Sequence, residues 1–170
     1  MIADIRNRFN QNFTPEKYKA LQDYITQKYD HKPPFRIAET PIFVPDILKN
    51  RLIEACDDIN SVICQPNFKE ITTEALRHPM LRVPGEDYHT RFLQMDFGIC
   101  LDDNGDPFPQ LIEVQGFPSL YFFQDILASA YKKFYDIPAD MTVHVNDMNR
   151  EEYIGLLKDI IVGDTDPKNV

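Results

Sequence analysis

Residues 91–124, RFLQMDFGICLDDNGDPFPQLIEVQGFPSLYFFQ, constrain the fold of this chain more strongly than any other stretch. Two apolar runs flank the segment from Asp102 to Asp106, whose Asp, Asn and Gly residues favour a tight chain reversal. The end of the stretch then takes up the apolar spacing of a helix. We therefore predict a β-hairpin over 91–115 that is followed directly by a helix.

Polar side chains gather on one face of this predicted hairpin. In the first strand the odd positions carry large apolar side chains, whereas the even positions include Gln94 and Asp96 and form the open face. In the second strand Glu113 and Gln115 share one face. With a two-residue turn centred on 104–105, Asp96 lies opposite Glu113 and Gln94 lies opposite Gln115. The prolines that follow the turn cannot donate to a ladder, so a longer turn with a shifted register is the alternative.

Two opposed carboxylates in this hairpin need a compensating charge. Directly opposed side chains on antiparallel strands have Cβ atoms about 4.5–5.5 Å apart, and like charges so placed are destabilising. Carboxylate and amide oxygens are the hard ligands that Mg²⁺ accepts together with water and substrate phosphates. The sequence therefore predicts Asp96, Glu113 and Gln115 as metal ligands.

Two other interpretations of the acidic residues stay open. Acidic side chains on the solvated face of a hairpin are common, and such a hairpin belongs equally well to a non-catalytic binding or interaction module. Asp102, Asp103 and Asp106 are assigned to the turn itself, with a calcium loop as the sharper alternative. The turn lacks the spaced ligands and the distal Glu of an EF-hand.

The composition predicts a soluble intracellular domain. The chain has 170 residues, 43% apolar content and a net charge of −9, which favours a globular fold and opposes binding to nucleic acid or to anionic membranes. The three cysteines form no CxxC pair, as in a reduced cytoplasmic protein. No apolar run is long enough to span a membrane. We expect one domain over 1–170, with residues 1–13 disordered.

Helical patterns and the hairpin together predict an α+β fold. An antiparallel or mixed sheet centred on 91–115 would be packed by four to five helices, with a further short strand at 141–145. Arg91, in a polar segment that enters the first strand, and Ser119, at the start of the next helix, are the predicted contacts to an anionic cofactor. The helical patterns cover 15–30, 46–63, 67–82, 119–135 and 149–161.

Three short motifs follow one another in the central stretch: QMDF at 94–97, EVQ at 113–115 and PSLY at 118–121. They resemble motifs in the synthetase domain of glutathionylspermidine synthase and related circularly permuted ATP-grasp proteins. Those proteins carry R-x-D-F in one strand, E-x-N in its partner and T-P-T-S-L-Y-E at the helix entry. The resemblance implies that this chain has part of an ATP-grasp fold.

The resemblance also implies roles for individual residues. In that family the Asp, Glu and Asn bind the Mg²⁺ of MgATP, which places metal ligands at Asp96, Glu113 and Gln115. The family arginine that contacts the transferred phosphate corresponds to Gln94, and Gln115 is a methylene longer than the family Asn.

The implied reaction is ATP-dependent ligation of a small carboxylate to an amine. In the family, the lysines and the glycine-rich loop that hold ATP lie downstream of this hairpin. We therefore expect residues 1–170 either to be the N-terminal part of a longer protein or to be a remnant that no longer binds ATP, and in both cases to be inactive as a ligase on their own.

Overall fold

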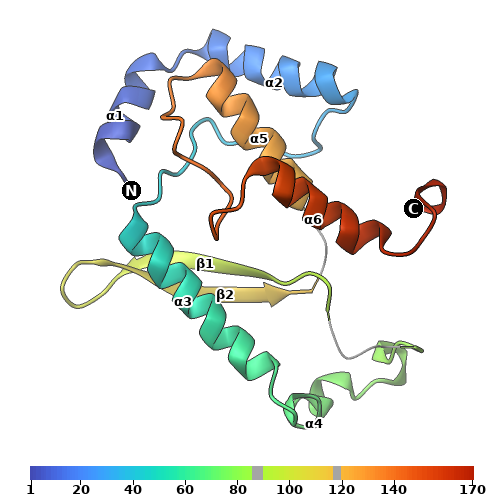
Figure 1. Cartoon of the computed structure of the whole chain (residues 1–170). Coiled ribbons are helices and arrows are strands. Elements are labelled where there is room, and N and C mark those ends of the chain that lie inside the picture. Colours follow the sequence, from blue (N-terminus) through green and yellow to red (C-terminus); the bar gives the residue numbers. More distant parts are fainter. Residues whose placement is uncertain (86–89, 117–119) are drawn as a thin grey trace. The chain divides into compact units, whose positions relative to one another are not determined.

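A computed structural model of the chain describes residues 1–85, 90–116 and 120–170. The chain forms two compact units: unit 1 comprises residues 1–43 and 119–170, and unit 2 comprises residues 44–118. The described residues contain six α-helices and one two-stranded antiparallel sheet (Figure 1). The protein therefore belongs to the α+β class, as the sequence predicts.

Unit 1 is a helical unit with an aromatic core. Helix α5 lies against α2 (Figure 1), and the apolar faces predicted for these two helices supply Leu21, Ile25 and Tyr131 to the core. The helices of unit 1 are α1 (Ala3–Asn12), α2 (Pro15–Tyr29), α5 (Tyr121–Phe134), α6 (Arg150–Val162) and the short η3 (Pro167–Asn169). The buried core consists of Phe9, Leu21, Ile25, Ile37, Phe43, Ala130, Tyr131 and Tyr135.

Two helix starts in unit 1 follow from local side-chain chemistry. The Thr14 hydroxyl accepts a hydrogen bond from the backbone N–H of Lys17 at 3.2 Å, and a proline occupies the first position of α2. At α6, the Asn149 side chain accepts from the backbone, and Glu152 accepts the Asn149 N–H in return at 2.8 Å. Both helices begin within one residue of their predicted start.

Residues 1–13 differ from the sequence-based expectation of disorder. Helix α1 covers most of this segment, and its Phe9 is 2% exposed. The Phe9 ring lies 4.4 Å from the Tyr135 ring and 5.9 Å from the Phe43 ring, centroid to centroid. Ile2, Ile5 and Phe13 pack against the core beside Phe9, and their helical spacing is the sequence signal that the expectation of disorder overlooked.

Two further segments differ from their predicted structure. Residues 141–145 form no strand in the described part of the chain, and Val143 and Val145 are both exposed. The predicted helix over 67–82 is instead a series of short pieces, because proline and threonine residues interrupt it. These pieces are α4 (Phe68–Ile71), η1 (Thr73–Leu76) and η2 (Pro79–Leu81).

None of the helices in the described ranges is both long enough and apolar enough to cross a membrane.

Unit 2 carries the hairpin on a single long helix. Helix α3 (Asp46–Ile63) contacts β2 (Pro107–Gln115), which pairs antiparallel with β1 (Gln94–Leu101) (Figure 1). The Arg51 guanidinium on α3 donates to the Pro107 carbonyl at 2.6 Å. This bond fixes the turn end of the hairpin to the helix.

The turn of the hairpin is longer than a two-residue turn. The Gly105 N–H bonds to the Asp102 carbonyl at 2.9 Å, and the Asp102 N–H bonds to the Asp106 carbonyl at 2.9 Å. Gly105 has a φ of +81°, which is the left-handed conformation that glycine accepts without strain. The reversal is therefore centred on Asn104 and not between residues 104 and 105, so each residue near the turn pairs with a partner one position earlier than predicted.

Candidate functional site

A β-bulge restores the predicted register at the open end of the hairpin. Near the turn, Phe97 pairs with Leu111, which would place Asp96 opposite Ile112 if the ladder continued regularly. The ladder instead shifts between Asp96 and Phe97, so that Asp96 pairs with Glu113. Ile112 is the extra residue, and its side chain approaches the position where Gly98 has no Cβ, at 3.7 Å.

The bulge brings four predicted site residues together on one face of the sheet. Gln94 pairs with Gln115, next to the pair of Asp96 and Glu113. The Gln94 Nε2 donates to Asp96 Oδ1 at 3.1 Å, and the Gln115 Nε2 lies 3.4 Å from Asp96 Oδ2. The Gln115 amide also donates to Glu113 Oε1. We call Gln94, Asp96, Glu113 and Gln115 the hairpin cluster.

The hairpin cluster is partly accessible. Glu113 is exposed, and the other three residues are half-buried. In the structure the amide N–H groups donate hydrogen bonds to the two carboxylates, which offsets the repulsion expected for this pair. Rotation of the Gln115 amide about its last side-chain torsion would present Oε1 instead, and Asp96, Glu113 and Gln115 would then offer only oxygen ligands.

What the hairpin cluster could bind is inferred from the chemistry of its side chains, because comparisons with known proteins give no match. No protein-family model, curated protein or solved structure matches the chain. Within the described ranges, no group of three or more His, Cys, Asp or Glu side chains is placed to hold a metal ion. The two carboxylates and the Gln115 amide oxygen would, together with water, make an all-oxygen donor set for a cation at the hairpin, and such a set fits Mg²⁺.

One of the two predicted cofactor contacts lies among the described residues. Arg91 lies in the exposed segment that enters β1, at the same end of the hairpin as the cluster. A Cβ at Gly116 would lie 3.3 Å from the Thr90 hydroxyl oxygen, so this entering segment passes close to the end of β2. Ser119 lies outside the described residues.

The acidic residues of the turn serve the turn itself. Asp102 Oδ1 accepts the backbone N–H groups of Asn104 and Asp106, each at 2.9 Å. Arg51 Nη1 lies 3.8 Å from Asp102 Oδ2, and Arg51 Nη2 lies 3.9 Å from Asp106 Oδ2. Because the carboxylates face backbone donors and a guanidinium, this geometry favours the structural role over a calcium loop.

A second polar cluster, in unit 1, escaped the sequence analysis. Asp125 on α5 is 2% exposed, and its Oδ2 accepts from Arg150 Nε at 2.9 Å. His144 Nε2 lies 3.4 Å from Asp125 Oδ1. The apolar spacing of α5 marks the inward positions of the helix but not this aspartate. The three residues come from positions 125, 144 and 150, and their spacing in the sequence does not indicate that they meet.

Proposed function

We propose that the hairpin cluster holds the Mg²⁺ of MgATP in an ATP-dependent carboxylate-amine ligase of the ATP-grasp type, to which this chain contributes the N-terminal portion. The observation that supports the proposal is the facing pair of Asp96 and Glu113, bridged by the Gln115 amide. These are the residues at which the sequence resemblance implies metal ligands.

The donor set suits a cation that also binds phosphate. Mg²⁺ usually takes one or two carboxylates, keeps several waters and binds substrate phosphate oxygens. Asp96 and Glu113 would supply the carboxylates, and Gln115 would supply an amide oxygen. The bound ion would neutralise charge on the β- and γ-phosphates while the phosphoryl group passes to the substrate carboxylate, before an amine displaces phosphate.

Gln94 is the proposed position of contact with the transferred phosphate. Its amide can donate a hydrogen bond to a phosphate oxygen, but it lacks the charge and the bidentate geometry of an arginine. The catalytic contribution of this position is therefore expected to be weaker than that of the arginine in the family.

Calorimetric titration with Mg²⁺ and with Mn²⁺, with and without ATP, tests the metal site. We expect saturable binding to the unmodified chain and about tenfold weaker binding to Asp96→Asn, because the variant loses a carboxylate ligand. Asp103→Asn is the matched control, since it makes the same charge change in the turn of the same hairpin and should bind the ion normally. Absence of saturable heat in the unmodified chain would contradict the proposal.

A coupled assay for ADP release tests the expected inactivity of residues 1–170 alone. We expect no turnover with MgATP, small carboxylates and amines. Supplying the cation ligands does not by itself provide an adenine pocket. Turnover by the isolated chain would show that the ATP site is complete within these residues.

The alternative function is a non-catalytic binding or interaction module. The hydrogen bonds from the Gln94 and Gln115 amides to the carboxylates favour it, because they already offset the repulsion between the two negative charges without a cation. For such a module the same titration should show no saturable heat, and Asp96→Asn should behave like Asp103→Asn.

A further inference from the structure

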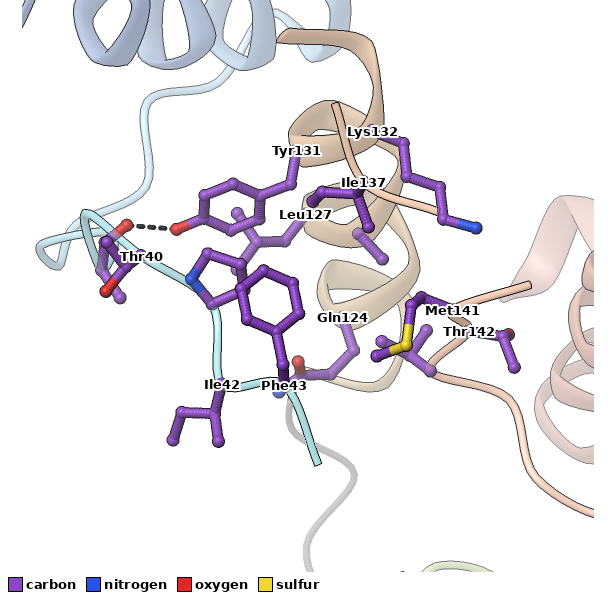
Figure 2. A pocket seen from close by; sticks show the side chains of 14 residues that line it. Thr40, Ile42, Phe43, Gln124, Leu127, Tyr131, Lys132, Ile137, Met141 and Thr142 are labelled. Carbon is purple, nitrogen blue, oxygen red and sulfur yellow. Dashed lines mark hydrogen bonds between the residues drawn. The ribbon is translucent and has the colours of Figure 1, made fainter. Parts of the chain in front are cut away.

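Unit 1 contains a pocket that the hairpin cluster does not use. It lies between the segment 38–43, helix α5 and the segment 137–143, and it has a volume of about 360 Å³ (Figure 2). This volume falls in the range of small-molecule sites, which span about 300–1,000 Å³. All of the residues that line it belong to unit 1.

The lining of the pocket is mostly apolar. Its buried side comes from the core, where Phe43 is 2% exposed and Tyr131 is 4% exposed. Leu127, Ile137 and Met141 complete the apolar wall (Figure 2). The unbranched Met141 side chain can adapt its shape to different apolar ligands.

Tyr131 closes one side of the pocket as a neutral group. Its hydroxyl donates a hydrogen bond to the Ala38 carbonyl (Figure 2). Burial raises the pKa of Tyr131 to about 12, with smaller contributions from the neighbouring hydroxyls of Tyr18 and Tyr135. The ring therefore contributes apolar surface to the pocket at neutral pH, while its polar atom is already satisfied by the backbone.

Lys132 brings a positive charge to the edge of this apolar surface. Among the described residues that line the pocket, Lys132 is the only one with a charged side chain, and none carries a carboxylate. Lys132 Nζ donates to the Ala139 carbonyl at 3.0 Å, which leaves further donors on the ammonium group. Because the whole chain has a net charge of −9, a positively charged pocket edge contrasts with the rest of the molecule.

The polar groups of the pocket lie at separate places on α5 and on the segment 137–143. Gln124 and Lys132 are about 12 Å apart along the helix axis, with Leu127 and Ala128 between them. The Thr142 hydroxyl oxygen accepts the His144 N–H at 3.0 Å and keeps its own proton to donate. A ligand that spans this surface would have an apolar body and an anionic end.

We propose that this pocket binds a small carboxylate with an apolar body, of the medium-chain fatty-acid type. The alkyl chain would lie against Leu127, Ile137 and Met141, and the carboxylate would accept hydrogen bonds from the Lys132 ammonium and the Thr142 hydroxyl. The proposal rests on residues of unit 1 alone and is independent of metal binding by the hairpin.

Octanoate is the probe, and the methyl groups of the methionines are the reporters. The chain has five methionines, and ¹³C labelling of their methyl groups places a signal at Met141 inside the pocket. We expect octanoate to shift the Met141 signal in a saturable manner while the signals of Met80 and Met95, in unit 2, stay in place. Replacement of Met141 by leucine assigns its signal.

Two pairs of variants separate the contributions of charge and shape. Lys132→Gln should weaken octanoate binding about fivefold, as expected for loss of a partly exposed ion pair. Lys133→Gln, which removes the neighbouring charge outside the lining, should not weaken it. Ala128→Leu should abolish binding by filling the pocket, whereas Ser129→Leu places a leucine on the exposed side of the helix and should not.

Octan-1-ol is the neutral comparison ligand, since it has a similar apolar body without the charge. If octan-1-ol binds as tightly as octanoate, or if Lys132→Gln leaves octanoate binding unchanged, the proposed recognition of a carboxylate is wrong. If octanoate does not shift Met141, or if Ala128→Leu still binds it normally, the pocket is not its site.

Discussion

Replacement of Phe9 by alanine is expected to lower the free energy of unfolding of unit 1 by about 4 kcal/mol, in the range for removal of a buried phenylalanine. Phe9 is 2% exposed and contacts three aromatic rings in the core. Removing its ring leaves a cavity among Phe43, Tyr131 and Tyr135 and withdraws the one buried side chain of α1. Urea unfolding followed by tyrosine fluorescence measures this change, because two of the neighbouring rings are tyrosines.

Phe122→Ala is the matched control for Phe9→Ala. Phe122 lies on α5 and is 39% exposed, so loss of its ring should cost less than about 1.5 kcal/mol. Phe9→Leu should fall between the two, since leucine fills part of the cavity. Equal unfolding free energies for Phe9→Ala and Phe122→Ala would show that α1 is not held to the core by its phenylalanine.

The second large effect is expected at the buried carboxylate of unit 1. Arg150→Ala should lower the free energy of unfolding by about 3 kcal/mol, because it leaves a buried charge without its strongest partner. The Asp125 side chain is 3% exposed, and its Oδ2 lies 2.7 Å from Arg150 Nη2 and 2.9 Å from Nε. The same unfolding measurement detects the loss.

Two controls isolate the effect of the buried charge. Arg36→Ala removes the arginine of the exposed Arg36–Glu39 pair and should cost less than about 1 kcal/mol. The double variant Asp125→Asn with Arg150→Ala should recover part of the loss, since a neutral amide is less costly to bury than a carboxylate. A double variant that is less stable than Arg150→Ala alone would mean that the cost does not come from the unpaired charge.

Local sequence chemistry was sufficient to predict the structure where residues within one helical turn decide it. Thr14 with its following proline, and Asn149 with Glu152, form the starts of α2 and α6 from residues within one turn. The spacing of apolar residues marked α3 and α5 for the same reason. The short strand expected at 141–145 is absent because isolated β-branched residues need a paired neighbour, and the described chain offers none there.

The hairpin shows how two departures from the simplest pattern can leave a predicted site intact. The longer turn shifts pairing by one residue, which alone would turn Glu113 away from Asp96. The bulge at Ile112 shifts it back, so both acidic residues return to one face. Neither the extra turn residue nor the bulge has a sequence signal as strong as strand alternation, and the two compensate only in the folded ladder.

Strand alternation and turn composition by themselves determined the hairpin and its polar face, whereas the pairing of Asp96 with Glu113 depends on the bulge in the folded ladder. Only the tertiary structure decided that Phe9 is buried in the core, that Asp125 is buried against Arg150, and that the apolar pocket ends at Lys132. The physical reason is distance along the chain. Patterns of period two or 3.6 record which side of an element is apolar, whereas a ring in a core, a buried ion pair or a pocket wall depends on residues that meet only after the elements have packed.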